Sequence, residues 1–293
     1  MSRRASRSLA AVLFGLVLAV CAAGASAEQS WKVLPPMPEL PPATVVGPVH
    51  VNDIEMWRAE FGPRDGKPVI MVHSGLANAN YFGPVIPFLV DEGFHVIAVD
   101  SRGHGRSTQS AQPYSYELMA SDVVAMLDAL RIPKADLVGW SDGGIIGIVM
   151  AIRNPERLNR VFAFSANTVP EGLIPDFDKK GVFADFEKRA RDEYDKLSPT
   201  PGQYDSFLKQ ISEMWATQPR ITDDQLKAIR TPITIADGRY DEVIKQSHNR
   251  YMAATIPNAH LMILPGVSHF AAIQNPPLFA RALLDELTAP WDD

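Results

Sequence analysis

Residues 136–145 read DLVGWSDGGI, and this stretch decides how the chain folds. An apolar run leads into a G-x-S-x-G pattern centred on Ser141, and a helical pattern over Ile145–Ile152 leaves it. Such a strand-to-helix turn has a crowded, strained backbone, and the glycines at 139 and 143 relieve the crowding. The turn would raise the Ser141 hydroxyl above the sheet edge, at a helix N-terminus that favours developing negative charge. We therefore predict that Ser141 is a nucleophile.

Short apolar runs on both sides of this turn predict a largely parallel sheet. The first two runs flank Asn52-Asp53 and indicate an antiparallel hairpin, whereas the other six are almost continuously apolar, as in strands buried on both faces. Helical patterns between them, clearest at Tyr116–Leu130 and Pro276–Leu287, favour a doubly wound α/β fold. The eight expected strands are Thr44–Val51, Ile54–Phe61, Val69–Val72, His95–Val99, Asp136–Trp140, Val161–Phe164, Ile233–Ala236 and Leu261–Leu264.

Residues 168–230 interrupt this alternation, because they contain helical patterns and no strand signal. The three patterns lie around Ala184–Tyr194, Tyr204–Trp215 and Asp223–Ile229. We expect a helical lid over the carboxyl edge of the sheet; two ordinary crossover helices are the alternative.

The first 27 residues have the order of a secretory signal peptide. Basic residues open the chain, Leu9–Ala23 is apolar, and Ala25-Ser26-Ala27 forms an A-x-A site, so we expect cleavage before Glu28 and a periplasmic or secreted protein. An uncleaved membrane anchor is the alternative, and Arg3-Arg4 leaves both the Sec and the Tat route open. The five prolines of residues 28–43 predict an extended, unpacked leader before a domain over residues 44–293.

Composition excludes several classes of protein. The chain has 293 residues, a formal net charge of −6 and one cysteine, Cys21. A disulfide scaffold and a multi-cysteine metal site are thereby excluded. No basic run lies beyond the first seven residues, so we expect no nucleic-acid partner. Removing residues 1–27 takes away three arginines and leaves a net charge of −9 without any cysteine or predicted membrane span.

A serine nucleophile needs a base and an acid, and the loops after the last two strands supply candidates. His269 follows the last strand and Asp241 follows the strand before it, giving the chain order Ser, Asp, His. Asp237 and Glu242 are rival acids. His248 and His260 are expected at the surface or a sheet edge.

The turn His73-Ser74-Gly75-Leu76 follows the third strand. A backbone N–H of Gly75 or Leu76 could join that of Asp142 in an oxyanion hole, while His73 is expected to be structural. We interpret the loop at 100–107 as rigid and hydrogen-bonded, the alternative being an anion site at Arg102 or Arg106.

Asp142 directly follows the nucleophile, so its carboxylate could attract a cationic substrate group. Alternatively, its side chain caps the next helix or bonds another partner. Trp215 is expected in the substrate pocket, and Trp140 beside the turn. Aromatic residues of the lid either line that pocket or form the lid's own core: Phe183, Phe186, Tyr194, Tyr204, Phe207 and Trp215.

Taken together, these motifs resemble the α/β-hydrolase fold superfamily from about residue 44 to 289. The segments are HSGL at 73, DSRGHGRS at 100, GWSDGG at 139, GRYD at 238 and GVSHF at 266. GWSDGG and the SAN turn at 165 resemble valacyclovir-hydrolase-type serine esterases more closely. Ser74 departs from the family, in which His-Gly is commoner.

The resemblance implies an eight-stranded sheet covered by helices on both faces and a helical lid. It also implies a cofactor-independent hydrolase with Ser141, Asp241 and His269 as its triad. We expect an esterase acting on a small or medium substrate. A lactonase, a C–C bond hydrolase or a perhydrolase would use the same residues, and a non-catalytic binding protein is the least favoured alternative. The sequence leaves the oligomeric state open.

Overall fold

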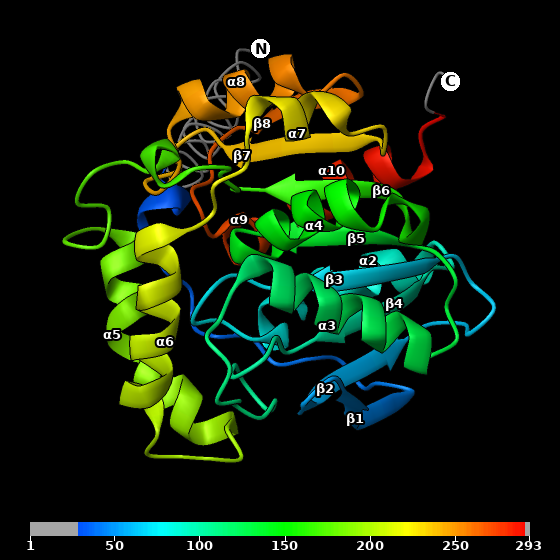
Figure 1. The fold of residues 1–293 in the computed structure, drawn as a ribbon, viewed down its shortest axis with the longest axis vertical. Coiled ribbons are helices and arrows are strands. Elements are labelled where there is room, and N and C mark those ends of the chain that lie inside the picture. Colours follow the sequence, from blue (N-terminus) through cyan, green and yellow to red (C-terminus); the bar gives the residue numbers. More distant parts are fainter. Residues whose placement is uncertain (1–28, 291–293) are drawn as a thin grey trace, which may run out of the picture.

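Eight strands form one sheet in the order β1-β2-β4-β3-β5-β6-β7-β8 (Figure 1). The structure is a computed structural model that describes residues 29–290, so the predicted signal peptide lies outside the described residues. The strands are β1 (Val45–Val51), β2 (Ile54–Phe61), β3 (Pro68–Val72), β4 (His95–Val99), β5 (Ala135–Trp140), β6 (Leu158–Phe164), β7 (Ile233–Gly238) and β8 (Ala259–Leu264). All eight expected strands are present, with ends shifted by at most three residues.

The pairing follows the hydrophobic pattern. β1 and β2 form the predicted antiparallel hairpin, β2 runs antiparallel to β4, and β3 to β8 are mutually parallel. Every residue of β5 is buried, as its unbroken apolar sequence requires, whereas β8 at the sheet edge is partly exposed. The fold class is confirmed: a mostly parallel α/β sheet.

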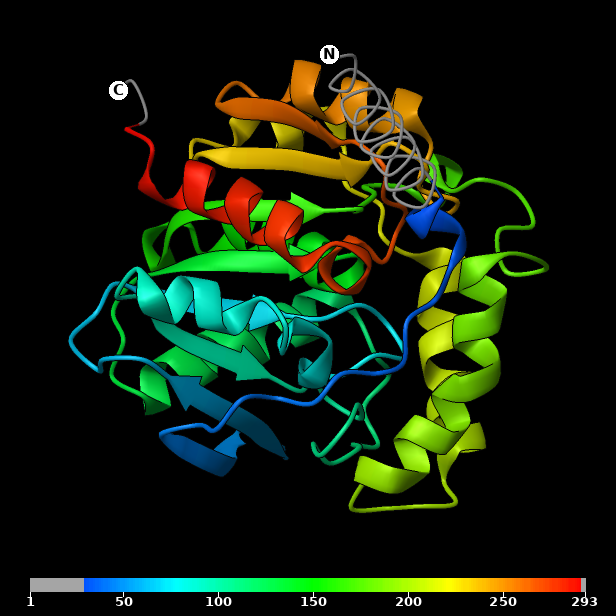
Figure 2. The ribbon, with the colours of Figure 1, turned by 180° about the vertical axis from the view of Figure 1, so that it is seen from behind.

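Helices cover both faces of the sheet. α3, α4, α7 and α8 lie on the face seen in Figure 1, and α2 and α10 lie on the face seen in Figure 2. The helices are η1 (Ser30–Lys32), η2 (Ala79–Phe82), α2 (Ile86–Asp91), α3 (Tyr116–Ala129), α4 (Asp142–Arg153), η3 (Pro155–Arg157), η4 (Pro170–Gly172), α5 (Val182–Leu197), α6 (Tyr204–Thr217), α7 (Asp223–Ala228), α8 (Gln246–Thr255), α9 (Ala271–Gln274) and α10 (Pro276–Thr288).

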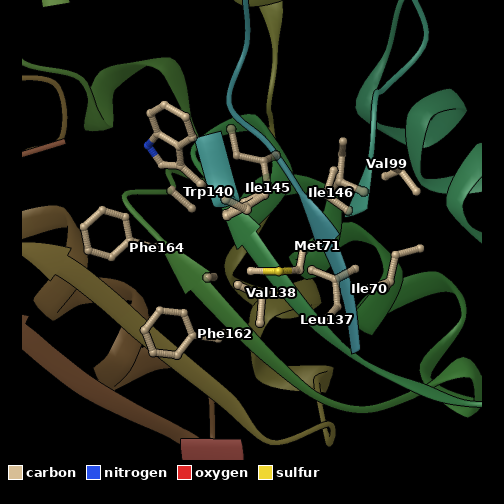
Figure 3. Packing of buried hydrophobic residues seen from close by; sticks show 14 of the residues in the cluster. Ile70, Met71, Val99, Leu137, Val138, Trp140, Ile145, Ile146, Phe162 and Phe164 are labelled. Carbon is tan, nitrogen blue, oxygen red and sulfur yellow. The ribbon is translucent and has the colours of Figure 1, made fainter. Parts of the chain in front are cut away.

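Around β5 and β6 the core is packed against α4 on one side of the strands (Figure 3). Ile145 and Ile146 of α4 are fully buried, and Phe279 of α10 packs edge-on against Phe162 and Phe164. Each such side chain contributes roughly 1.5–3 kcal/mol by leaving water. The strand that carries Ser141 is thus held from both faces.

The helical insertion divides into two parts. α5 and α6 lie beyond the carboxyl ends of the central strands, where a lid was expected (Figure 1). α7, by contrast, packs on the sheet face beside α4 and α8, as an ordinary crossover helix does. The lid therefore consists of α5 and α6, and the remaining helix of the predicted insertion belongs to the α/β layers.

Residues 29–43, which we call the strap, are extended after the short helix η1, as predicted. Contrary to the prediction, they pack against the rest of the protein. They run from the end of β8 past the lid to β1 (Figure 2). Leu34, Met37 and Leu40 are partly buried against the core, because proline-fixed extended chain still presents side chains to a neighbouring apolar surface. Within residues 29–290, no helix is both long and apolar enough to cross a bilayer.

Candidate active site

Ser141 lies between β5 and α4 in a backbone conformation that few non-glycine residues adopt. Its φ is 55° and its ψ is −115°, and its N–H donates to the carbonyl of Phe164 at 2.7 Å. A Cβ at position 139 would lie 2.2 Å from the Gly143 carbonyl oxygen, and one at position 143 would lie 2.0 Å from that of Val72. Only glycine fits either position. Strain of this kind costs about 1–3 kcal/mol and is concentrated at functional sites.

His269 and Asp241 form a fully buried pair at the same edge of the sheet. His269 Nδ1 lies 2.9 Å from Asp241 Oδ2, and both side chains are 0% exposed. Asp241 Oδ1 accepts hydrogen bonds from the backbone N–H groups of Val243 and Ile244 at 2.6 and 2.8 Å. Within the described residues, His269 Nε2 is buried without a hydrogen-bond partner. This arrangement fixes the imidazole and leaves its second nitrogen free to take a proton.

Charge decides the protonation of this pair. Burial lowers the pKa of His269, but Asp241 outweighs that effect and raises it above its ordinary value. Burial raises the pKa of Asp241, but the imidazolium of His269 lowers it by more. The pKa of Asp241 is therefore below its ordinary value, and the carboxyl is held ionised. Burial and the charge of Asp241 raise the pKa of Glu242 to about 7.

The two rival acids have other partners. Asp237 is buried; it accepts from Ser165 Oγ at 3.0 Å, Gly238 N at 2.8 Å and Gln246 Nε2 at 2.8 Å. Glu242 Oε2 meets only the backbone N–H of His269, at 3.4 Å. Asp241 is therefore the carboxylate that bonds the imidazole.

A cavity of about 270 Å³ lies between this edge and the lid. Its wall includes the expected site residues Gly75, Ser141, Asp142 and Trp215, together with Phe183. Leu76 does not line the cavity and is packed in the core. Within residues 29–290 the backbone N–H groups of Gly75 and Asp142 have no hydrogen-bond acceptor, which leaves them free for a ligand.

The side chain of Asp142 bonds two neutral donors. Tyr116 Oη donates to Oδ1 at 2.8 Å, and Trp215 Nε1 donates to Oδ2 at 2.9 Å. Burial nevertheless raises the pKa of Asp142 to about 6. The charge of His269 acts against burial and lowers this pKa in part. In the described chain Asp142 thus bonds the neutral structural partners that the alternative hypothesis required.

Sequence reasoning missed several wall residues. Tyr116, Asn167, Leu173, Phe177 and Gln218 all line the cavity. Tyr116 was predicted only as the first residue of a helix, because periodicity does not distinguish a packing tyrosine from one whose hydroxyl reaches a second helix. No local signal marked Gln218, which lies just beyond the end of α6.

The lid aromatics serve two purposes. Phe183 and Trp215 border the cavity, whereas the other four pack within the lid or onto the core: Tyr194 stacks on Phe207 at 5.4 Å, and Phe186 meets Tyr81 at 5.8 Å. Trp140 packs beside the turn, 5.8 Å from the His269 ring.

The loop after β4 is structural. Arg102 is 0% exposed in its side chain and bonds Asp122 and Asp53, and Arg106 bonds Asp100. These ion pairs occupy both Arg102 and Arg106, so neither is free to bind an anion, and they support the interpretation of a rigid loop.

His73 and His248 are also structural. His73 Nδ1 bonds the Ser74 carbonyl at 2.7 Å, and burial lowers its pKa to about 4. The expectation for His248 was wrong: it is buried and accepts from Thr168 N at 3.0 Å, because the loop after β6 covers it. Among residues 29–290, no group of histidine, cysteine and acidic side chains has the arrangement of a metal site.

Known proteins share this architecture. A family model described as the alpha/beta hydrolase fold matches residues 67–203. A 3-oxoadipate enol-lactonase of Acinetobacter baylyi is 28% identical over 257 residues, covering 79% of this chain and 92% of the relative. The human serine hydrolase BPHL is 24% identical over 234 residues, covering 75% of this chain and 79% of that protein.

The solved structure of a meta-cleavage product hydrolase from Pseudomonas fluorescens superimposes with a TM-score of 0.70. It is 24% identical and covers 84% of this chain and 97% of that one. The chain therefore has the alpha/beta hydrolase fold, as the motifs predicted. At 24–28% identity over three quarters or more of the chain, it is similar to an enol-lactonase, a meta-cleavage product hydrolase and a human serine hydrolase.

Proposed function

We propose that this protein is a serine hydrolase that cleaves a carboxylic ester through an acyl-enzyme on Ser141. One observation carries the proposal: a strained serine at a helix N-terminus shares a sheet edge with a buried Asp–His pair whose outer nitrogen has no partner among residues 29–290. Neither strain nor an unpartnered buried nitrogen stabilises a fold, so their coincidence favours catalysis.

In the proposed reaction, Ser141 Oγ attacks the ester carbonyl carbon while His269 Nε2 takes its proton. Asp241 holds the imidazole in position and stabilises the imidazolium. The N–H groups of Asp142 and Gly75 would bind the oxyanion. His269 then protonates the departing alkoxide, and a water molecule deprotonated by His269 releases the acid.

The substrate is proposed to lie in the cavity lined by Asp142 and Trp215. Its small size favours a small or medium ester over a long-chain lipid. The buried carboxylate of Asp142, which accepts from the neutral donors Tyr116 and Trp215, supports an amino group on the substrate, since a buried carboxylate gains most from a cation. A lactone is an internal ester and would react in the same way. The relatives include an enol-lactonase and a C–C bond hydrolase, so both chemistries belong in the test.

A fluorophosphonate probe tests the proposal directly. The mature protein should be labelled at Ser141 alone, with the adduct mapped by mass spectrometry, and Ser141→Ala should lose both the label and about 10⁴-fold or more in kcat. Turnover is then compared across linear esters, α-amino esters with their des-amino analogues, lactones and a C–C substrate. Near wild-type turnover by Ser141→Ala would reject the mechanism. A folded protein that neither labels nor turns over would indicate a binding role.

A further inference from the structure

Three hollows meet at Gln218, the residue that follows the last turn of α6. Gln218 lines the active-site cavity and two outer hollows. The first, which we call the α4 hollow, has a volume of about 160 Å³ and is bordered by Val149, Ile152 and Ile221. The second, the α6 hollow, has a volume of about 470 Å³ and lies on the outer side of the lid helix. Gln218 therefore lies between the active-site cavity and the two outer hollows.

A hydrogen bond fixes the side chain of Gln218 in this position. Its Oε1 accepts a hydrogen bond from the backbone N–H of Tyr116 at 3.2 Å. The backbone N–H of Gln218 donates to the Met214 carbonyl at 2.8 Å. Tyr116 also lines both the active-site cavity and the α4 hollow. The contact between the start of α3 and the end of α6 thus lies between the active-site cavity and the α4 hollow.

We infer that Gln218 sets the length of substrate chain that the active site accepts, an inference that rests on the proposed ester hydrolysis. Gln218 lines both the cavity of about 270 Å³ and the α4 hollow. The wall of that hollow has an apolar part, formed by Val149, Ile152 and Ile221, beside polar and charged side chains. A hydrocarbon chain would gain free energy by continuing into that hollow, since each buried methylene favours binding. The amide of Gln218 blocks this path. It is a specificity-determining residue and takes no part in the chemistry.

Shortening the side chain should join the two spaces. We expect Gln218→Ala to extend the preferred chain by about two carbons. The kcat/KM for the first ester that the wild type rejects should rise roughly tenfold, as burial of two more methylenes predicts. The measurement is kcat/KM over an acyl series from acetate to decanoate and over a matching alkyl series. A shift in either series supports the inference.

Two control variants separate length from other effects. Thr217→Ala changes a residue that lines both outer hollows but not the active-site cavity, so its length profile should match the wild type. Gln218→Met keeps the length of the side chain and removes its hydrogen bond to Tyr116, and it should also keep the wild-type profile. If Gln218→Ala does not fold, Gln218→Ser carries the same expectation.

The outcomes distinguish the two proposals. If Ser141 is labelled but Gln218→Ala keeps the wild-type length profile, or if Thr217→Ala shifts it equally, the inference is wrong and the proposed function stands. If the wild type neither labels nor hydrolyses esters, the proposed function fails. The inference is then decided by binding of linear fatty acids, measured by isothermal titration calorimetry: Gln218→Ala should tighten binding of the longer acids only, and equal affinities would overturn it.

Discussion

At the scale of single residues, His269 is surrounded by more carboxylates than a base requires. Asp241 bonds it, and the charges of Glu242 and Asp142 raise its pKa further. Glu242 makes no short bond to the imidazole, and its Oε1 is buried without a partner in the described chain. Glu242 therefore bonds only the backbone of His269 in the described chain, and its charge raises the pKa of the imidazole without a direct bond to the ring.

Replacing Glu242 should alter the pH profile of catalysis. A general base works only when unprotonated, so kcat/KM rises as pH passes the pKa of His269. Glu242→Gln removes a negative charge and lowers that pKa, so the acid limb should move to lower pH by a few tenths of a unit. The effect requires ionised Glu242, whose own pKa is about 7. The measurement is the kcat/KM pH profile.

A matched substitution makes this result specific. Glu92, at the end of α2, is exposed, and Glu92→Gln changes the net charge of the protein equally. Its acid limb should stay where the wild type has it. An unmoved limb in Glu242→Gln, or one that moves to higher pH, would show that Glu242 does not act on the base.

At the scale of elements, the strap links the two sides of the active site. Trp31 stacks on Tyr240, which precedes the acid, with ring centroids 4.3 Å apart. Gln274 of α9 donates to the carbonyls of Trp31 and Val33 at 3.3 and 3.1 Å. Arg189 of lid helix α5 bonds the Pro35 carbonyl. One extended segment therefore contacts the acid loop, the base loop and the lid.

Gln274 is the residue through which the strap supports the base. Its Oε1 accepts from the N–H of Ser268 at 2.8 Å, immediately before His269. Gln274→Ala removes this bond together with both strap bonds. We expect kcat to fall by about tenfold or more with little change in KM, since small displacements of a catalytic group are costly. The free energy of unfolding should also fall, by about 1–3 kcal/mol.

Steady-state kinetics and urea unfolding together test this role. Asn258→Ala is the control, because Asn258 Nδ2 makes a comparable loop bond to the Arg230 carbonyl at 2.9 Å, away from the base loop. It should lose stability but keep kcat. Unchanged kcat in Gln274→Ala would mean that the strap supports the fold only.

At the scale of the whole molecule, the chain is acidic and its one cysteine precedes the predicted cleavage site. A mature protein without cysteine has no thiol to oxidise outside the cytoplasm. We therefore propose export, with cleavage after Ala27. Ala27→Phe should block cleavage and accumulate the precursor, because the site requires small residues at positions 25 and 27.

N-terminal sequencing and cell fractionation check this proposal. Ser26→Phe changes the middle position of the A-x-A site, where size matters less, and should still be processed. A wild-type protein that begins at Met1 or Ser2 would contradict export by this route.

Local patterns determined much of this protein. The strand positions, the hairpin and the glycine-bounded turn at Ser141 could be predicted because periodicity and backbone crowding are properties of neighbouring residues. Ser141, Asp241 and His269 could be proposed as a triad because each follows a parallel strand, and these strands end at one edge of the sheet. The strand positions, the hairpin and the turn are set by residues that are close in the sequence.

Tertiary structure decided the rest. Only folding selects Asp241 over Asp237 and Glu242 as the partner of His269. The choice depends on how the loop after β7 meets the loop after β8, which brings together two residues 28 positions apart. It also brings Trp215 to Asp142 across 73 residues, buries His248 and lays the strap on the core. Such contacts depend on the relative placement of whole elements, which no local pattern encodes.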